Sequence, residues 1–387
     1  MENGNDLILV VDDEPKNIRY LGNILREKGY NISFASDGEK ALLLLEQTKP
    51  DLILLDIMMP GIDGFEVCTR IKRNPELMDI PIIFLSSQTK TEYIVNGFKA
   101  GSVDYVIKPF NPAELLARVK TQIEIKKAQK AIINLNRELE AVNKKLEQEL
   151  LHAAEYVKSL LPDNISSEQI TTDWQYIPSS YLGGDSFGFH WLDENNLAVY
   201  LLDVSGHGVN SALLSVSILN LIKTHSLVDA DFNDPKSVLA ALNSKFSIEE
   251  NVLNFFTIWY GVINTTKKEI IYSSAGHPPA ILLKELDQPV LLKGEGIWIG
   301  AVRDFLYKNH SFQITGENKL YVFSDGLFEI TDGKENSFSY NDLLNIITSS
   351  AFNGGNPLNK ILSSLSSAND NKKFEDDLAI MELKLHL

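Results

Sequence analysis

The sequence predicts a chain of three parts: an α/β domain with a parallel sheet, a long helix, and an α+β domain. Residues 7–120 alternate short β-branched runs with amphipathic stretches, as doubly wound sheets do. The next part has no proline between Pro112 and Pro162 and is rich in Lys, Glu, Ala, Leu and Gln, which favours a helix. Residues 170–387 consist mainly of apolar strand-like runs, which indicates an α+β sandwich with helices outside.

Five short apolar runs in the first part are the predicted strands, at residues 7–11, 31–35, 52–55, 82–85 and 105–107. The carboxyl ends of parallel strands meet at one edge of such a sheet, and ligands bind there. The polar residues that follow these strands are Asp12, Asp13, Asp56, Ser86 and Lys108. Because clustered carboxylates repel one another, we expect Mg²⁺ with oxygen ligands there and a lysine as a further positive charge. Asp56 is then placed to act as the nucleophile toward a phosphoryl group.

Residues 6–122 resemble the receiver domains of two-component systems, which have a flavodoxin-like fold. The resemblance is carried by Asp12-Asp13, Asp56 with Met58-Met59-Pro60-Gly61, Ser86, and Lys108-Pro109-Phe110. It implies a sensor histidine kinase as partner and Asp56 as the phosphoacceptor. It also implies a Mg²⁺ site formed by Asp13, Asp56 and the Met58 carbonyl beside Asp12, and a switch set of Ser86, Tyr105 and Lys108. The alternative is that these aspartates are ordinary helix caps, but this does not explain five matches at one edge.

The helical part carries an apolar seam at spacings of three and four, formed by Ile125, Ala128, Ile132, Leu135, Leu139, Val142 and Leu146. A lone helix this polar has nothing to cover the seam, so we expect a homodimer. Apolar positions resume at Leu150 after a four-residue step, as in a stutter. The alternative is a long helix that contacts the chain's own domains. The expected boundaries are 1–122 for the receiver, 123–162 for the connector and 163–387 for the last domain.

Four aspartates in the last part stand at strand ends or in glycine-rich turns. Asp203 precedes Val204-Ser205-Gly206, Asp185 follows Gly183-Gly184, Asp325 precedes Gly326, and Asp376 precedes Asp377. Glycine keeps backbone bulk away from a docking group, and carboxylate oxygens suit divalent ions, so four of them suggest a two-metal site. Two bridged ions lower the pKa of a water molecule and make hydroxide available for attack on a phosphate monoester.

This region resembles the SpoIIE-type branch of the metal-dependent (PPM) serine/threonine phosphatases. The resemblance is carried by Asp185, Asp203, Ala275-Gly276-His277-Pro278-Pro279, Ser324-Asp325-Gly326, Asp376-Asp377 and the preceding Ser159-Leu160-Leu161-Pro162. It implies two Mn²⁺ or Mg²⁺ ions and a phosphoserine or phosphothreonine protein as substrate, typically an anti-sigma-factor antagonist.

The same resemblance assigns roles to the individual aspartates. It implies that Asp203 bridges both ions with help from the Val204 carbonyl, and that Asp325 and Asp376 complete the second ion's shell. Asp185 binds directly or through water. The chain departs from many relatives at Gly188, where they carry another acidic residue. His207 and His277 are candidates for a general acid, but we expect them to hydrogen-bond their loops, because activated water needs no separate base.

Composition narrows the function classes. A formal net charge of −16 argues against binding to nucleic acid or to an anionic membrane. No apolar run reaches the roughly 18 residues of a membrane helix, and the start lacks a basic signal-peptide head, so the cytoplasm is expected. The other function class considered is an inactive phosphatase-like adaptor that sequesters a regulatory protein. The presence of Asp203, Asp325 and Asp376 in the chain argues against this adaptor, because burying three carboxylates costs stability and an inactive domain does not need them.

Overall fold

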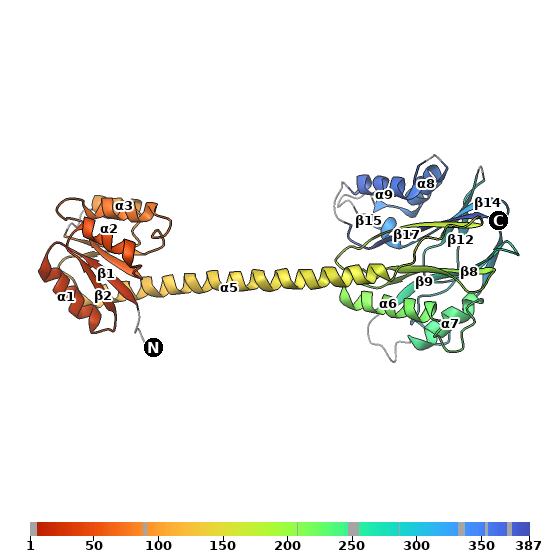
Figure 1. Ribbon diagram of the computed structural model, residues 1–387, viewed down its shortest axis with the longest axis horizontal. Helices are drawn as coiled ribbons and strands as arrows, with labels where there is room; N and C mark the ends of the chain where they lie inside the picture. Colours follow the sequence, from red (N-terminus) through yellow and green to blue (C-terminus); the bar gives the residue numbers. More distant parts are fainter. Residues whose placement is uncertain are drawn as a thin grey trace. The chain divides into compact units, whose positions relative to one another are not determined.

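The structure is a computed structural model that describes residues 6–87, 91–206, 208–246, 255–285, 287–331, 337–352, 355–369 and 374–387 (Figure 1). The chain divides into two compact units, residues 1–144 and 145–387, and the helix α5, Pro112–Ser159, contributes to both. No described helix is both long and apolar enough to cross a membrane. The predicted order of an α/β part, a long helix and an α+β part is confirmed.

The first unit is built on a parallel sheet with the strand order β2-β1-β3-β4-β5. Its strands are β1 Leu7–Val11, β2 Asn31–Ala35, β3 Leu52–Asp56, β4 Ile82–Ser86 and β5 Asp104–Ile107. The helices between them are α1 Pro15–Arg26, α2 Gly38–Gln47, α3 Gly64–Arg73 and α4 Thr91–Lys99. Parallel neighbours require such crossovers. All five predicted strands are confirmed, and three of them are one residue longer than predicted.

Helices cover both faces of this sheet. One core joins Leu9, Ile53 and Phe84 to the buried sides of α2 and α3. The other joins Ile8 and Leu54 to α1 and the beginning of α5. Because both faces are covered, β1, β3 and β4 are nearly continuous apolar runs without alternation. The carboxyl ends of these strands form one edge of the sheet, and at or just after them stand the polar residues Asp12, Asp13, Asp56 and Ser86.

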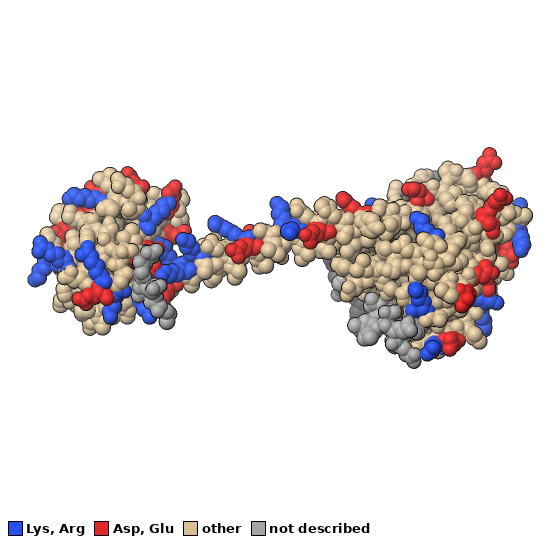
Figure 2. All heavy atoms as spheres, turned by 60° about the horizontal axis from the view of Figure 1, so that its bottom comes forward, with Lys and Arg blue, Asp and Glu red and all other residues tan. Residues whose placement is uncertain are grey.

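Helix α5 is buried at its start and exposed along its middle. Leu115, Val119 and Ile123 lie in the core of the first unit, and Lys127 donates to Asp6 at 2.7 Å. The apolar seam beyond them is exposed in the single chain at Ile125, Ile132, Leu135, Leu139, Val142 and Leu146. Acidic and basic side chains are interspersed over the visible face of each unit (Figure 2). The seam is thus an apolar stripe without a covering partner in the described chain.

The second unit is a sandwich of two antiparallel five-stranded sheets (Figure 1). The first sheet has the order β13-β10-β9-β8-β7, and the second has β12-β11-β14-β17-β6. The strands are β6 Ile170–Ile177, β7 Ser186–Trp191, β8 Asn196–Val204, β9 Phe256–Asn264, β10 Glu269–Ala275, β11 Ala280–Lys284, β12 Val290–Leu292, β13 His310–Gln313, β14 Glu317–Phe323 and β17 Leu378–His386. A hairpin of β15 Ile330–Thr331 and β16 Ser337–Phe338 stands apart from both sheets.

Helices cover the outer faces of the sandwich. They are α6 Val209–Lys223, α7 Pro235–Lys245, α8 Tyr340–Ala351 and α9 Pro357–Ala368, with the short 3-10 helix η1 Asp325–Leu327. Alternation along β17 separates the layers, since Met381 joins the core shared by both sheets and Ile380 joins the core beneath α8 and α9. Figure 1 shows α6 and α7 on one side of the sandwich and α8 and α9 on the other.

The sequence prediction omits several elements of this sandwich. Strands β6 and β7 are the outermost strands of their sheets, where polar residues such as Thr172 and Gln175 or a glycine such as Gly188 are tolerated. Helix α9 is serine-rich, which lowers its intrinsic helix propensity. These elements therefore form because of contacts with the rest of the domain, and their local sequence does not predict them. The predicted sandwich with outer helices is otherwise confirmed.

Candidate functional site

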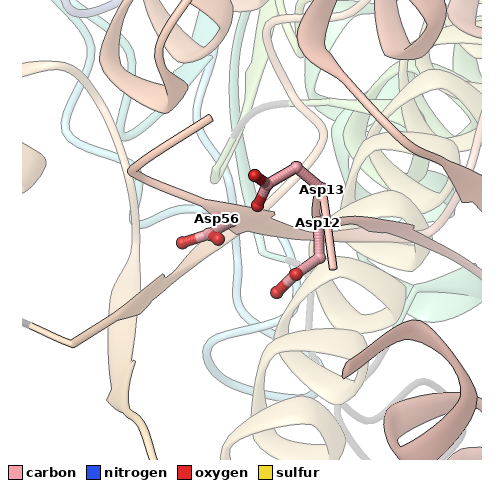
Figure 3. Close-up of side chains that lie close together, drawn as sticks. All are labelled: Asp12, Asp13 and Asp56. Carbon is pink, nitrogen blue, oxygen red and sulfur yellow. The ribbon is translucent and has the colours of Figure 1, made fainter. Parts of the chain in front are cut away.

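Three carboxylates meet at the polar edge of the first unit. One oxygen of each of Asp12, Asp13 and Asp56 lies within 4.8 Å of the others (Figure 3). The strands explain this proximity, because β1 and β3 are parallel neighbours and these residues stand at their carboxyl ends. Asp12 and Asp56 are buried, whereas Asp13 is exposed. Converging carboxylate oxygens with one open side suit Mg²⁺.

Lys108 supplies a positive charge to this cluster. Its Nζ donates to Asp12 Oδ2 at 2.8 Å and to Asp56 Oδ2 at 2.7 Å. Burial opposes the charged form of Lys108, but its hydrogen bonds and ion pairs with both carboxylates prevail and raise its pKa. Burial raises the pKa of Asp56, and the hydrogen bond and charge of Lys108 partly offset this. The amide of Met58 also donates to Asp56 Oδ1, at 3.4 Å.

Ser86 and Tyr105, predicted as switch residues, lie together. Both line one small cavity below the acidic cluster, with Ile57, Phe84 and Phe98 among its other walls. Ser86 is buried, and Tyr105 has its ring edge-on to Phe98 with centroids 6.4 Å apart. The structure therefore brings the predicted phosphoacceptor, lysine and switch pair to one edge of the sheet.

The second unit has its own acidic centre at one end of the sandwich. Asp185 and Asp203 come from neighbouring strands of the first sheet, since Ser186 pairs with Leu202. Asp325 and Asp376 come from neighbouring strands of the second sheet, where Phe323 pairs with Ile380. Each sheet thus contributes two of the four predicted aspartates.

Burial and neighbouring carboxylate charges raise the pKa values of Asp185, Asp203 and Asp325. Burial raises the pKa of Asp203 to about 7, and the charges of Asp325 and Asp376 add to the shift. Burial also raises the pKa of Asp185 well above its usual range, with Asp203 and Asp377 as the main charged neighbours. For Asp325, burial, Glu329 and Asp376 raise the pKa to about 6. The centre therefore holds more negative charge than its surroundings neutralise.

The donor set of this centre fits hard divalent cations. Every predicted ligand is an oxygen, which Mn²⁺ and Mg²⁺ both accept. Asp185 Oδ2 is buried and has no hydrogen-bond partner among the described atoms, although a buried carboxylate oxygen normally has one. In the described ranges, no three ligand atoms here come within 4.8 Å of one another, so the centre is wider than the receiver cluster.

Close contact between two loops holds the predicted Val204 carbonyl near Asp185. A Cβ on Gly184 would lie 2.5 Å from the Val204 carbonyl oxygen, so this close approach requires glycine. The amide of Gly208 donates to the Leu182 carbonyl at 3.1 Å, and Ser211 Oγ donates to the Ser205 carbonyl at 3.3 Å. The loop after β8 and the loop before β7 are thereby joined.

Asp377 has a role that the sequence left open. It is buried, and its carboxylate accepts hydrogen bonds from the amides of Ser179 at 2.7 Å, Gly184 at 2.6 Å and Asp185 at 3.4 Å. A Cβ on Gly183 would lie 2.4 Å from Asp377 Oδ2. Asp377 therefore fixes the loop that carries Asp185. The signal in the sequence is the doublet Asp376-Asp377, in which one member faces the centre and the other is turned into the loop.

His277 and Gly188 have local explanations. His277 Nδ1 lies 2.8 Å from Thr257 Oγ1, and burial lowers the pKa of His277 to about 3, so the ring is neutral at physiological pH. The ring of His277 thus contacts strand β9 and not its own loop, so that expectation is wrong for this histidine, whereas His207 lies outside the described residues. A Cβ on Gly188 would lie 2.4 Å from the hydroxyl of Tyr200, so an acidic side chain does not fit there.

Comparison with known proteins divides the chain in the same way. The family profile "Response regulator receiver domain" matches residues 8–120, and that of "Stage II sporulation protein E (SpoIIE)" matches residues 193–386. The second match covers half of the chain and includes Asp203, Asp325 and Asp376, whereas Asp185 precedes it.

Curated relatives match over part of their length. The DNA-binding response regulator MtrA of Mycolicibacterium smegmatis is 39% identical over 123 residues, which are 32% of this chain and 53% of MtrA. A probable cyclic di-GMP phosphodiesterase of Vibrio cholerae is 42% identical over 133 residues, which are 34% of this chain and 30% of that protein. The chain thus spans about half of MtrA and less of the phosphodiesterase.

A solved structure shares the fold of the second unit. The SiaA-PP2C domain of Pseudomonas aeruginosa aligns with a TM-score of 0.54 and 17% identity, and the alignment covers 64% of this chain and 99% of that domain.

Proposed function

Because this chain belongs to the SpoIIE family and carries a receiver domain before its phosphatase domain, we propose that it is a response regulator with a metal-dependent phosphatase output. Its receiver, residues 1–122, is phosphorylated on Asp56. Its connector, residues 123–162, passes this state to the phosphatase domain, residues 163–387. The observation that carries the proposal is the centre of Asp185, Asp203, Asp325 and Asp376, of which one is buried, two are half-buried and one is exposed. Burial and neighbouring carboxylate charges raise the pKa values of the first three and so favour divalent cations.

The proposed reaction is hydrolysis of a phosphate monoester. Two divalent cations, Mn²⁺ or Mg²⁺, supply the positive charge that polarises the phosphoryl group and acidifies a water molecule for in-line attack. Asp203, whose pKa is raised by burial and by the charges of Asp325 and Asp376, would hold the position shared by both ions, with the Val204 carbonyl beside it. Asp325 and Asp376 bind from the second sheet, and Asp185 binds from the loop that Asp377 fixes. The centre thereby joins both halves of the sandwich.

The proposed partners follow from the two domains. In the receiver, Mg²⁺ is held by Asp12, Asp13, Asp56 and the Met58 carbonyl, and the phosphodonor is a sensor histidine kinase. The substrate of the phosphatase is a protein carrying phosphoserine or phosphothreonine, an anti-sigma-factor antagonist in our proposal. The negative net charge of the chain itself disfavours nucleic acid as a substrate, so we propose a protein substrate.

We also propose that the connector pairs two chains. The exposed seam supports this, because burying one such leucine or isoleucine side chain contributes about 1.5–3 kcal/mol. A paired helix fixes the rotational register of the domains at its ends, so phosphorylation at Asp56 acts by shifting that register or the pairing.

Turnover of p-nitrophenyl phosphate by the purified chain with Mn²⁺ tests the enzymatic assignment. We expect turnover that depends on Mn²⁺ and is lost in EDTA. A phosphoserine protein that binds without being hydrolysed, together with no turnover of the small ester, supports the adaptor instead and contradicts the proposal.

Insertions between Leu139 and Val142 test the connector. Seven residues lengthen the helix by about 10 Å and restore the seam, so control by the receiver persists. Two residues rotate the downstream helix by about 200°, so control is lost while basal turnover remains. The measurements are turnover with and without beryllofluoride, and mass by light scattering. Equal responses of both insertions, or a monomeric parent, contradict the register proposal.

A further inference from the structure

Two exposed aromatic side chains stand beside the acidic centre of the phosphatase domain. Phe255 is 50% exposed and Trp298 is 47% exposed, and their ring centroids lie 5.6 Å apart. We call Phe255 and Trp298 the aromatic edge. Large apolar side chains exposed in contact with each other commonly mark an interaction site, and tryptophan is prominent among residues that dominate binding.

The register of β8 and β9 places this edge close to Asp203. Asp203 pairs with Thr257, and the pairing continues past the strand ends because the Ser205 amide donates to the Phe255 carbonyl at 3.1 Å. Paired residues and residues two apart along a strand share one face of a sheet, so Phe255 extends on the same face as Asp203. Phe255 lies two residues beyond Thr257, which is about 7 Å along the strand.

Trp298 reaches the same place from a loop that contacts the turn of Gly276. The Gly276 amide donates to the Gly296 carbonyl at 2.9 Å, and a Cβ on Gly276 would lie 3.0 Å from the Trp298 amide nitrogen. The Ile299 amide donates to the Phe256 carbonyl at 2.9 Å. The loop is thus attached to the strand that carries the edge.

A buried asparagine fixes this loop further. Asn243 of α7 is 2% exposed, donates to the Val302 carbonyl at 2.9 Å and accepts from the Gly300 amide at 2.9 Å. The hydroxyl of the buried Tyr307 donates to the Ile297 carbonyl at 3.2 Å. The backbone around Trp298 is therefore held from both sides, and its indole is presented to solvent on a fixed loop instead of being folded into the core.

We propose that the aromatic edge binds an apolar side chain of the protein substrate, two or three residues from its phosphorylated serine or threonine. This inference rests on the proposed phosphatase function. An extended segment advances about 3.3 Å per residue, so two or three residues span about 7–10 Å, which matches the roughly 7 Å along the strand from Thr257, the pairing partner of Asp203, to Phe255. The occupant is thus an extended phosphorylated segment with an aliphatic residue at that spacing, which makes Phe255 and Trp298 specificity determinants.

A set of synthetic phosphoserine peptides tests this directly. The peptides are identical except that leucine replaces serine at one position, either two or three residues before or after the phosphoserine. We expect kcat/KM of the full chain with Mn²⁺ to rise roughly tenfold for leucine on one side, the scale of a single apolar contact. Trp298→Ala and Phe255→Ala remove this preference, and Trp298→Phe keeps part of it.

The matched control is Trp191→Ala. Trp191 is 38% exposed and ends β7 at the opposite end from Ser186, so it lies away from the acidic centre. We expect this variant to keep the leucine preference. All variants turn over p-nitrophenyl phosphate at the parent rate, because that ester is too small to reach the edge.

Several outcomes overturn the inference. The first is a parent without leucine preference at any position. The second is a preference that survives both Trp298→Ala and Phe255→Ala. The third is an equal loss of small-ester turnover in these variants, which shows that the two side chains have a structural role. A mass by light scattering that halves on Trp298→Ala shows an interface between two copies instead. A parent that hydrolyses neither peptide nor small ester rejects the proposed function itself, whereas intact small-ester turnover without leucine preference rejects this inference alone.

Discussion

The receiver and the phosphatase domain each gather aspartates near strand ends, but they compensate the negative charge differently. In the receiver, the ammonium group of Lys108 lies within 2.8 Å of both Asp12 and Asp56. In the phosphatase domain, no described lysine or arginine forms an ion pair with Asp185, Asp203, Asp325 or Asp376. Among the described residues, the first site has a lysine as counter-charge and the second has none. We therefore expect the two sites to respond differently to metal, to pH and to substitution.

The carboxylates of the two sites also differ in their hydrogen bonds. Asp12 accepts from the side chain of Asn17 at 3.0 Å and from the Glu14 amide at 2.9 Å, besides Lys108. Asp185, by contrast, has a buried oxygen with no partner in the described chain. A satisfied carboxylate cluster stays in place by itself, and an unsatisfied one is completed by what binds to it.

The largest effect is expected for Asp203→Asn. The substitution removes the charge shared between two cations, so Mn²⁺-dependent turnover falls more than 100-fold, beyond the 10–100-fold typical of losing a partner of a metal ligand. Labelling of Asp56 by acetyl phosphate stays at the parent level, because the receiver has its own site. Turnover of p-nitrophenyl phosphate and radiolabel incorporation measure the two properties. Comparable turnover in the variant contradicts the assignment of Asp203.

A smaller effect is expected for Asp377→Ala. The loop that carries Asp185 loses the acceptor of its Ser179 and Gly184 amides, and Mn²⁺ affinity falls by about 10–100-fold. Calorimetric titration with Mn²⁺ measures the affinity.

The matched control for Asp377 is Asp193→Ala. Asp193 also accepts two backbone amides, those of Asn195 and Asn196, but in an exposed turn away from the centre. We expect unchanged affinity there. Equal affinities in all three proteins show that Asp377 does not position Asp185.

Lys108→Met tests the self-compensation of the receiver. Without the ammonium group, Asp12 and Asp56 face each other unneutralised, and the receiver loses about 1–3 kcal/mol of unfolding free energy in EDTA. Excess Mg²⁺ restores part of this loss, because it replaces the missing charge. Chemical denaturation with and without Mg²⁺ gives the values. Identical unfolding free energies of the parent and Lys108→Met in EDTA show that Lys108 does not stabilise the receiver by neutralising Asp12 and Asp56.

The pH dependence is expected to be the mildest and most diagnostic difference. The pKa values of Asp203, about 7, and Asp325, about 6, lie above those of ordinary carboxyls, so the folded metal-free domain binds more protons than the unfolded chain between about pH 4 and pH 7. Its stability is therefore greatest at the acidic end of this window and decreases as pH rises through the folded pKa values.

Protons and Mn²⁺ compete for the same oxygens, so Mn²⁺ affinity changes in the opposite direction. It weakens as pH falls below 7, by up to about tenfold per pH unit for each proton displaced. Titrations with Mn²⁺ between pH 5.5 and 8 measure this. An affinity independent of pH contradicts the raised pKa values.

The aspartates of both centres could be singled out from the sequence because each stands next to an apolar run or a glycine turn. Asp12 and Asp56 end strands of a parallel sheet, and strand direction alone places them together. Asp203 and Asp325 are equally visible, but their proximity depends on how two sheets stack, which local sequence does not specify. Their roles as ligands, and that of Asp376, stay predictions.

Other features required the tertiary structure. Asp377 looks like its neighbour Asp376 in the sequence, and only the packing of the Gly183 loop shows that its carboxylate accepts the amides of the loop that carries Asp185. Phe255 and Trp298 are 43 residues apart in the chain, and nothing in the local sequence pairs them. The position of Trp298 depends on the loop that Asn243 holds, which is a long-range contact.

The most direct test of receiver control is the turnover of a phosphoserine peptide at fixed Mn²⁺, measured before and after acetyl phosphate is added to the parent and to Asp56→Ala. We expect the rate of the parent to change as Asp56 becomes phosphorylated, and the rate of Asp56→Ala to stay constant. A parent whose rate is unaffected by full phosphorylation, or a variant that responds as the parent does, contradicts the control of this phosphatase through Asp56.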